Sequence, residues 1–347
     1  MIPHNKIVTT RDDRGMVDRV ISSGHLSQGT EVAALEADMC AFTGRRYAVA
    51  VSSGTEALRL AMLAFSGRRV TVPGYSCVAL ANAAMAARGG RMPVAGDVLP
   101  GQWTLDPDEI GHDLELDVVV AVNTFGVKSD VLGLAAAGAR VIEDCTHGFG
   151  EHLSDIEVLS FHATKLLGGA GGGVILTGDD RVAHFVRDMR DYDDKAPGPL
   201  PSTIRLNGKM TDVHAALVRS KLRRLPLLIE ERAELAALYW EQLRDVQLLL
   251  PEHVPFDGRT WYRFTIEVDD AEFYLRRLEQ LGIQAAAPVD NWLAKSAPPI
   301  KEEYAPVSYR AYRGIVSLPC YNWLTKAEVL HIARCVREVA LESRKAA

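Results

Sequence analysis

The sequence predicts an α/β protein with a large N-terminal domain, built on a mainly parallel mixed sheet, and a smaller C-terminal α+β domain. Up to about Asp144, short apolar segments alternate with helical patterns, which is typical of βαβ units and a parallel sheet. Past Gly150, two short apolar segments flank a glycine-rich connection, and we expect them to be neighbouring antiparallel strands. A long helical pattern that begins near Thr211 marks the change to the second domain.

The large domain is expected to hold short strands separated by helices. Thr30 is the expected N-cap of the first recognisable helix, and Gly44 lies just past its end, where glycine is favoured. The Pro-rich stretch 191–201 is expected to be an exposed loop. The expected strands are 47–51, 69–72, 117–123, 140–143, 158–161 and 174–177, and the expected helices are 31–42, 56–65 and 78–87.

The boundary between the domains is expected along the long helix 211–243, whose pattern breaks near Pro226. This gives a large domain over 1–225 and a small domain over 226–347. The small domain is expected to contain strands at 264–268 and 315–318, a helix at 271–281 that Gly282 ends, and a final helix. The final helix opens with Thr325 and Glu328 at the spacing of a capping box.

Composition narrows the class of protein. The chain has 347 residues, 48% of them hydrophobic, which is enough to bury a sizeable core. A formal net charge of −6 argues against a nucleic-acid partner, which usually meets a basic surface. The first fifteen residues contain no long apolar run, and the later apolar stretches are interrupted, so we expect no signal peptide and no membrane span.

The five cysteines are scattered and odd in number, so they suggest neither a disulfide framework nor a metal site. A reducing cytoplasm is therefore the expected location.

The first candidate site is Ser53-Gly54-Thr55, which lies between an expected strand and an expected helix. The first turn of a helix has free N–H groups and a partial positive charge, so it binds phosphate well. Gly54 would let the backbone approach closely, and Thr55 could add a hydroxyl group. A simple N-cap is the alternative, since Ser and Thr favour that position in any helix.

The second candidate is Asp144, which with Glu143 ends an apolar strand. In open parallel sheets, ligands bind outside the carboxyl ends of the strands, so Asp144 could contact a cofactor there. The alternative is a helix N-cap or a surface turn.

The third candidate is Lys165, in the sequence Ser160-Phe161-His162-Ala163-Thr164-Lys165. Because side chains alternate along a strand, Ser160 and His162 are expected on one face, and Lys165 in the following loop can reach the same edge. An exposed lysine without a special role is the alternative.

The glycine run 168–173 follows Lys165. A dinucleotide-binding loop requires a strand before the glycines and a helix after them, whereas here a strand follows. A P-loop fails too, because no Gly-Lys-Ser/Thr ends the run. Close backbone packing or a mobile loop at the site fits better.

Together these segments resemble the PLP-dependent sugar aminotransferases of the DegT/StrS type, and the similarity spans most of the chain. The Schiff-base segment, which contains Lys165, is the most specific of the matching segments. They are "LSQG" at 26–29 with Glu36 in the following helix, "SSGTEALRLAML" at 52–63, "VIEDCTHGFG" at 141–150, "LSFHATKLLGGAGGGVILT" at 159–177, "RLNGKMTDVHAALVRSKL" at 205–222 and "IVSLPCYNWLT" at 315–325.

The resemblance implies the aspartate aminotransferase fold, also called PLP-dependent transferase fold type I, and pyridoxal 5′-phosphate (PLP) as cofactor. Lys165 would hold PLP as the internal aldimine and later act as the base, and Asp144 would pair with the pyridinium nitrogen. The residues implied to bind the phosphate are Ser53, Gly54, Thr55 and Ser160.

Other implied roles concern the rim of the site. Asn207 would reach the cofactor phosphate of a neighbouring subunit, which implies a homodimer with active sites at the interface. Cys77 stands where many members of the family have an aromatic ring stacked on the cofactor, and Tyr75 could take over that contact. His147 replaces a usual Gln beside the cofactor, either as a neutral hydrogen-bonding substitute or as an acid–base group. Two further departures are Asn123, where His is common, and Lys209, where Arg is usual.

The implied activity is transfer of an amino group from L-glutamate to a keto sugar through pyridoxamine phosphate, and we expect the sugar to be nucleotide-linked. One alternative is a sugar dehydratase on the same fold, although the related dehydratases have histidine in place of the lysine. A cyclitol acceptor is a second alternative, and a non-catalytic relative that serves as a regulator or assembly partner is a third.

Overall fold

A computed structural model describes residues 1–65, 69–110, 117–192, 204–246, 248, 250–251 and 259–346. Its larger sheet is built from β1 to β7, in the spatial order β1-β7-β6-β5-β4-β2-β3. These strands are β1 (Tyr47–Val51), β2 (Val70–Pro73), β3 (Val94–Gly96), β4 (Val118–Val122), β5 (Arg140–Asp144), β6 (Ile156–Ser160) and β7 (Gly173–Thr177).

The larger sheet is mixed and mainly parallel, as predicted. Strands β3, β2, β4, β5 and β6 pair in parallel, whereas β7 runs antiparallel to both β6 and β1. The predicted antiparallel pair on either side of the glycine run is therefore confirmed. The strand β3 was not predicted, since it has only three residues, and two of them are not buried.

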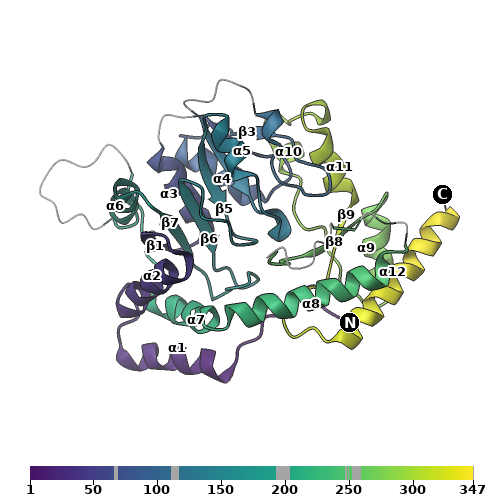
Figure 1. The fold of residues 1–347 in the computed structure, drawn as a ribbon, viewed down its shortest axis with the longest axis horizontal. Helices are drawn as coiled ribbons and strands as arrows, with labels where there is room; N and C mark the ends of the chain where they lie inside the picture. The colour runs from purple at the N-terminus through teal and green to yellow at the C-terminus, as the bar shows by residue number, and fades with distance from the viewer. Residues whose placement is uncertain are drawn as a thin grey trace, which may run out of the picture.

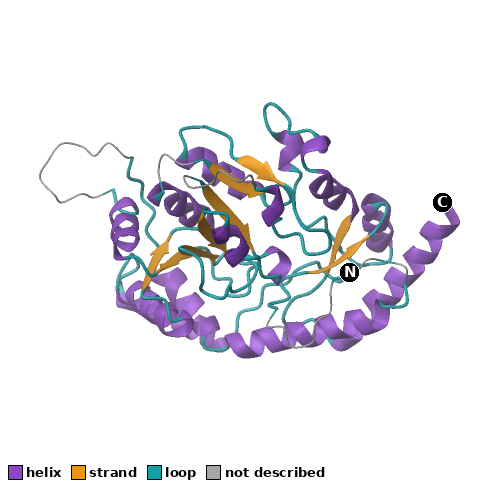
Figure 2. Cartoon of the chain, turned by 45° about the horizontal axis from the view of Figure 1, so that its top comes forward, coloured by secondary structure: helices purple, strands orange, loops and turns teal. Residues whose placement is uncertain are grey.

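Helices cover both faces of this sheet (Figure 2). Alternate residues of β1 illustrate the division: Val49 and Val51 pack with α3, α4 and α6, while Ala48 and Ala50 pack with α2 and α7. Burial on both faces explains why the strands are almost continuously apolar. The helices are α2 (Thr30–Thr43), α3 (Gly54–Ala64), α4 (Val78–Ala87), α6 (Asp180–Met189) and α7 (Asp212–Leu222).

The predicted cap of α2 is wrong. Thr30 is the first helical residue, and Gly29 occupies the N-cap position without a side-chain hydrogen bond. The carboxylate of Asp212 replaces the missing cap: its Oδ1 accepts from the N–H of Gly29 at 2.9 Å and from that of Val32 at 3.0 Å. A residue 180 positions away therefore caps this helix, and a local sequence pattern cannot reveal such a cap.

The long helical pattern forms two helices, α7 and α8 (Leu225–Leu243). The break falls at Arg223 and Arg224, and Pro226 lies in the first turn of α8, where its missing N–H costs nothing. In Figure 1, α8 extends from beneath the larger sheet to the second, two-stranded sheet. That sheet pairs β8 (Phe264–Glu267) with β9 (Ile315–Leu318) in antiparallel register.

Two further helices pack with α8 and the second sheet: α9 (Ala271–Gln280) and α12 (Lys326–Ala346). Gly282 follows α9 with a φ of 82°, and the predicted capping box of α12 forms between Thr325 and Glu328. The division at residue 225 stays a prediction.

The segment between α9 and β9 returns to the larger sheet. Trp292, Leu293 and Ala305 join the apolar cluster around α3 and α4, and the hydroxyl of Tyr312 donates to the carbonyl of Gly74. This segment contains α10 (Trp292–Lys295) and α11 (Pro306–Gly314). It brings C-terminal residues to the rim of the cavity described below.

Several elements were not predicted, and some of them are too short for a periodic pattern to be detected. The longer ones are α6, α11 and α1, which begins with a capping box between Thr10 and Asp13. The unpredicted elements are α1 (Arg11–Ser23), α5 (Val131–Ala136), α6, α10, α11 and 3-10 turns at Pro107–Glu109, Thr124–Gly126 and Glu302–Tyr304. Most of the predicted loop 191–201 lies outside the described residues. No helix in the described ranges is long and apolar enough to span a membrane.

Candidate active site

A cavity of about 390 Å³ lies at the carboxyl ends of β4, β5 and β6. This is the position at which open parallel sheets bind their ligands. Eight of the nine predicted site residues line it, namely Ser53, Gly54, Thr55, Cys77, Asp144, His147, Ser160 and Lys165.

The N-terminus of α3 forms one wall of the cavity. Ser53 is the N-cap of this helix, and its Oγ accepts from the N–H of Glu56 at 3.0 Å. Ser53 therefore caps α3, as the alternative proposed, and it also lines the cavity. A Cβ on Gly54 would lie only 2.6 Å from Cβ of Ser160, so glycine is needed where α3 meets the end of β6. Free helix N–H groups and two serine hydroxyls thus converge on one spot, which suits a phosphate.

Asp144 ends β5 on the cavity side of the sheet, and only 6% of its surface is exposed. Its Oδ1 accepts from the N–H of Thr146 at 2.9 Å. Burial raises the pKa of this carboxyl, although the bond from Thr146 and the charge of Lys165 offset part of that shift. The alternative role of Asp144 was a place in a surface turn. Asp144 does form a turn with Thr146, but its side chain is buried.

Lys165 lies in the turn after β6, and its side chain is partly exposed to the cavity. Its Nζ lies 4.5 Å from the ring centre of Tyr262, and it forms no ion pair with any carboxylate in the described part of the chain. The turn is held by a hydrogen bond from the N–H of Lys165 to the carbonyl of His162 at 2.8 Å. The lysine is therefore positioned by its backbone, while its amino group is left available.

The glycine run supports this turn, as the close-packing interpretation predicted. A Cβ on Gly168 would lie 2.3 Å from the carbonyl oxygen of Ala163, and one on Gly173 would lie 2.6 Å from that of Ser53. The buried ammonium group of Lys221 donates to the carbonyl of Gly168. Burial lowers the pKa of this second lysine.

His147 is held in an aromatic stack. Its ring lies 4.3 Å from that of Tyr262 and 5.9 Å from that of Phe125, nearly parallel to both. Its Nδ1 accepts from the N–H of Phe125 at 3.3 Å. Burial, with the charges of Lys165 and Arg263, lowers the pKa of His147 well below its usual value. We therefore interpret His147 as a neutral hydrogen-bonding residue rather than an acid–base group.

Cys77 precedes α4 and exposes its side chain at the cavity wall. Tyr75, the suggested substitute for a stacked aromatic residue, also lines the cavity but is 1% exposed. It packs edge-on against Tyr312 at 4.9 Å and against Trp103 at 5.9 Å. Burial raises the pKa of Tyr75 well above its usual value, and within the described residues its hydroxyl has no hydrogen-bond partner.

Asn207 does not reach this cavity and is exposed to solvent. The two other departures from the family pattern also lie away from it. Asn123 is buried and donates to Glu143 at 2.9 Å and to the carbonyl of Gly148 at 3.1 Å, which ties down the segment after Asp144. Lys209 pairs with Asp191 at 2.5 Å.

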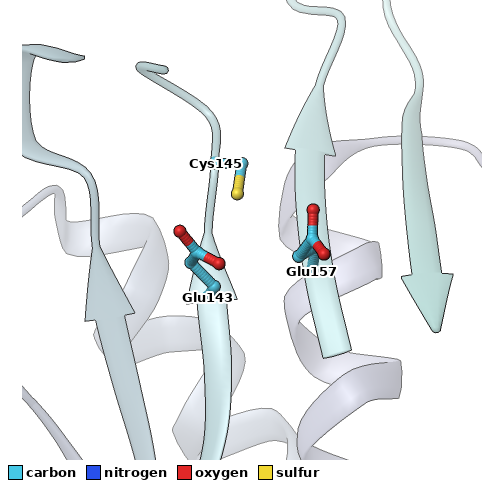
Figure 3. Close-up of side chains that lie close together, drawn as sticks. All are labelled: Glu143, Cys145 and Glu157. Carbon is cyan, nitrogen blue, oxygen red and sulfur yellow. The ribbon is translucent and has the colours of Figure 1, made fainter. Parts of the chain in front are cut away.

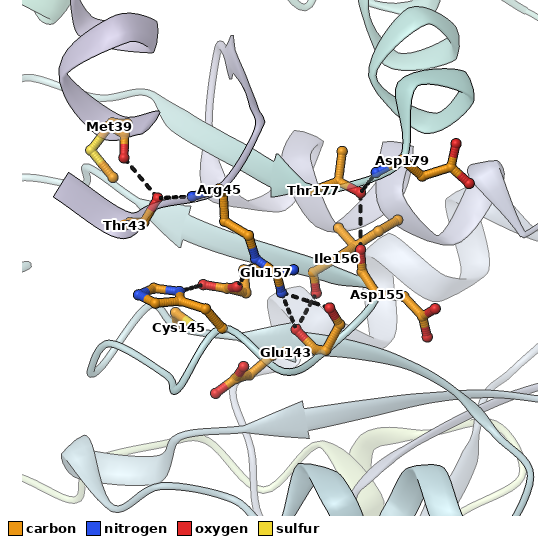
Figure 4. A network of polar contacts seen from close by, with 12 residues as sticks. Met39, Thr43, Arg45, Glu143, Cys145, Asp155, Ile156, Glu157, Thr177 and Asp179 are labelled. Carbon is orange, nitrogen blue, oxygen red and sulfur yellow. Dashed lines mark hydrogen bonds and ion pairs between the residues drawn. The ribbon is translucent and has the colours of Figure 1, made fainter. Parts of the chain in front are cut away.

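Three buried side chains lie together on the side of β5 opposite Asp144: Glu143, Cys145 and Glu157 (Figure 3). Their ligand-type atoms lie within 4.8 Å of one another. However, Glu157 is already paired with Arg45 at 2.5 Å (Figure 4). Nδ1 of His152 also lies 2.7 Å from the Glu157 carboxylate. Burial and the nearby Glu157 raise the pKa of Glu143. Arg45 already pairs with Glu157, and Glu143 accepts a hydrogen bond from Asn123, so we assign the cluster a structural role.

Residues that the sequence did not single out lie at or near the site. Val289 joins the cavity wall from the segment that returns to the larger sheet, whereas Tyr262 and Arg263, just before β8, do not line the cavity. Tyr262 stacks on His147 and lies near Lys165. No spacing or motif marks these residues, because their place depends on how the C-terminal part folds back.

A lysine, a buried carboxylate and a helix N-terminus at the carboxyl ends of a mainly parallel sheet form the arrangement expected of an aminotransferase of fold type I. The chain belongs to the DegT/DnrJ/EryC1/StrS aminotransferase family, whose model matches residues 8–337. It is therefore an enzyme of the aminotransferase class, and the predicted fold is confirmed.

Individual relatives are similar over nearly their whole length. The dTDP-3-amino-3,4,6-trideoxy-alpha-D-glucose transaminase of Micromonospora megalomicea subsp. nigra is 27% identical over 93% of both chains. The structure of S. venezuelae DesV in complex with a ketimine intermediate is 26% identical, covers 94% of both chains and has a TM-score of 0.86. NtdA from Bacillus subtilis, solved with bound cofactor PMP, is 25% identical, covers 97% of this chain and 83% of its own, and has a TM-score of 0.82.

Proposed function

We propose that this protein is a PLP-dependent aminotransferase that moves an amino group from L-glutamate to a keto sugar. The observation that carries the proposal is the meeting of Lys165 and Asp144 in one cavity with the N-terminus of α3. Three groups far apart in the sequence thus provide an amine, a buried carboxylate and a phosphate-binding helix end.

The residues present fit PLP. Gly54 and Ser160 approach so closely that no other side chain intrudes between the helix end and the serine hydroxyl. This leaves Ser53, Thr55 and Ser160 to hold the phosphate. Asp144 is buried, and a buried carboxylate is stabilised by a cation such as a protonated pyridine nitrogen.

Bound PLP acts as an electron sink that stabilises negative charge on the substrate carbon. Lys165 would hold the cofactor and, as a free amine, would carry the proton that moves during amino transfer. Asp144 would keep the ring nitrogen protonated. Neutral His147 would add no charge beside the cofactor, and Cys77 lies at the cavity wall where many relatives have an aromatic ring.

We propose a nucleotide-linked keto sugar as acceptor, because the relative from Micromonospora acts on a dTDP-linked sugar by its name. Lys165 disfavours the dehydratase alternative, since the related dehydratases have histidine at this position. An aminotransferase with a cyclitol acceptor would use the same site. Only a measurement of which acceptor is converted distinguishes it from a sugar aminotransferase.

We also propose a homodimer in which Asn207 contacts the cofactor phosphate of the partner subunit. Asn207 is exposed, and its neighbours Ile204 and Leu206 have 77% and 46% of their surfaces exposed. Large apolar side chains so exposed near a predicted contact residue suit a subunit interface.

The experiment records the visible absorbance of the PLP-loaded protein before and after addition of L-glutamate. Loss of the visible band, with pyridoxamine phosphate recovered from the protein, is the expected result, and Lys165→Ala should show neither. If the wild-type band forms and no amino acid changes it, the aminotransferase proposal fails and the non-catalytic alternative gains. Sedimentation velocity on the same sample should give a dimer, and a monomer would contradict the shared site.

A further inference from the structure

A second cavity, of about 50 Å³, adjoins the active-site cavity, and Thr164 and Lys165 line both. Its other walls come from the N-terminal segment 5–8, the end of α7, the first half of α8 and the segment 321–323 before α12. Among the described residues, no acidic side chain lines this second cavity. Five cationic residues do, namely Lys6, Lys165, Lys221, Arg224 and Arg232. The function proposed above uses only Lys165.

Two of these cations are buried and form no ion pair within the described ranges. Lys221 is 8% exposed and Arg232 is 4% exposed. The ammonium group of Lys221 donates to the carbonyl of Gly168. Arg232 donates to Oδ1 of Asn322 at 2.9 Å and to the carbonyl of Tyr262 at 3.2 Å. All three acceptors are neutral, and a buried charge is costly unless an opposite charge compensates it.

The acidic side chains close to the cavity do not supply that charge. Asp13 lies outside the cavity and already pairs with Arg224 at 2.6 Å. Glu231 also lies outside the cavity, and its Oε2 accepts from the amide of Asn322 at 2.8 Å. Positive charge therefore exceeds negative charge around this small space.

The pKa values of the two buried cations indicate the same excess. Burial lowers the pKa of Lys221, and Asp13 opposes part of this shift. The charges of Arg224 and Arg232 lower the pKa of Lys221 further. Burial also lowers the pKa of Arg232. An anion among these groups would relieve their mutual repulsion.

We propose that this cavity binds one small inorganic anion of the size of chloride, held by Lys221 and Arg232. A cavity of about 50 Å³ has room for such an ion or for water, but water would leave both charges uncompensated. The anion would also brace the turn that bears Lys165, because Lys221 donates to Gly168 in the same turn region. The inference does not depend on the proposed function, since anion binding is measured directly.

The test measures chloride binding to the PLP-loaded protein through the line width of the chloride NMR signal. Titration with sodium chloride, at an ionic strength held constant with sodium gluconate, gives the dissociation constant. We expect Lys221→Met to raise that constant about 10- to 100-fold, the effect of losing a hydrogen bond from a charged group. Lys326→Met is the matched control, because Lys326 is an exposed lysine of α12 and lies outside the cavity. It should leave the constant unchanged.

Bromide soaked into crystals of the wild-type protein provides a readout that needs no substitution. We expect its anomalous signal in the cavity, in contact with Lys221 and Arg232. Water alone in the cavity, or equal chloride affinity of Lys221→Met and the wild-type protein, would overturn the inference. Displacement of chloride by an equal concentration of inorganic phosphate would also overturn it, because the cavity would then be a phosphoryl site. Neither readout requires conversion of L-glutamate, so failure of the proposed function would leave the anion site standing.

Discussion

Tyr262 links Lys165, His147 and Arg263 within the site. It is 5% exposed, it stacks on His147, and both cations lie within 5 Å of its ring centre. Burial alone would raise the pKa of this phenol. The charges of Lys165 and Arg263, with a hydrogen bond from Thr164, instead bring it down to about 8. A phenolate next to two cations is more stable than one in water alone.

We expect the cofactor-free protein to contain one tyrosine that titrates near pH 8, and Tyr262→Phe to remove this titration. Lys165→Met should raise the pKa of Tyr262, because the nearest favourable charge is lost. Absorbance at the phenolate wavelength, recorded as the pH is raised, measures the effect. Lys209→Met provides a matched control, because Lys209 lies 4.8 Å from the ring centre of a different tyrosine, Tyr192. A phenol near pH 8 that persists in Tyr262→Phe would contradict the assignment.

Individual site residues could be predicted from the sequence where they belong to a local motif. Ser53-Gly54-Thr55 and the segment from Ser160 to Lys165 each join a strand end to a turn, so their position at one sheet edge follows from the topology. Tyr262, Arg263 and His4 could not be predicted in this way. Their positions depend on contacts between distant parts of the chain, such as Arg263 with His4, which are 259 positions apart.

At the scale of elements, the cap of α2 by Asp212 joins two helices that are far apart in the sequence. Asp212 is 1% exposed and is the first residue of α7. A Cβ on Gly29 would lie 2.7 Å from its Oδ2, so glycine is needed at that position. The carboxylate therefore holds the start of α2 against α7.

Asp212→Ala should lower the free energy of unfolding by about 1–2 kcal/mol, as loss of a helix N-cap does. Two N–H groups of α2 would lose their acceptor in a buried place. Asp212→Asn keeps one acceptor oxygen and should lose less. Urea denaturation of the three proteins measures the difference. Equal stability of Asp212→Ala and the wild-type protein would show that α2 does not depend on this cap.

Most strands and long helices were predictable, because their apolar periodicity and end signals are local. The bounds of β1, α4 and β9 agree with the prediction to the residue. Short elements such as β3 and α5 gave no signal, because they contain too few residues for a period to appear. α1 was missed although its Thr10–Asp13 capping box stands in the sequence.

For the whole molecule, the main result is that the segment after α9 returns to the larger sheet before β9 joins the second sheet. Val289 and Tyr312 reach the cavity and its supporting aromatic cluster by this route. The fold class was predictable from alternating strands and helices, and the family resemblance supplied the site. The return of the C-terminal segment was not predictable, because it is fixed by packing of Trp292 and Leu293 on a distant apolar cluster.

The central claim is that Lys165 holds PLP. The most direct measurement is borohydride reduction of the PLP-loaded protein, followed by digestion and mass spectrometry to find the modified lysine. The account predicts a pyridoxyl group on Lys165 and on no other lysine. Modification of Lys221 or Lys209 in its place, or no modified lysine in a protein that has bound PLP, would contradict it.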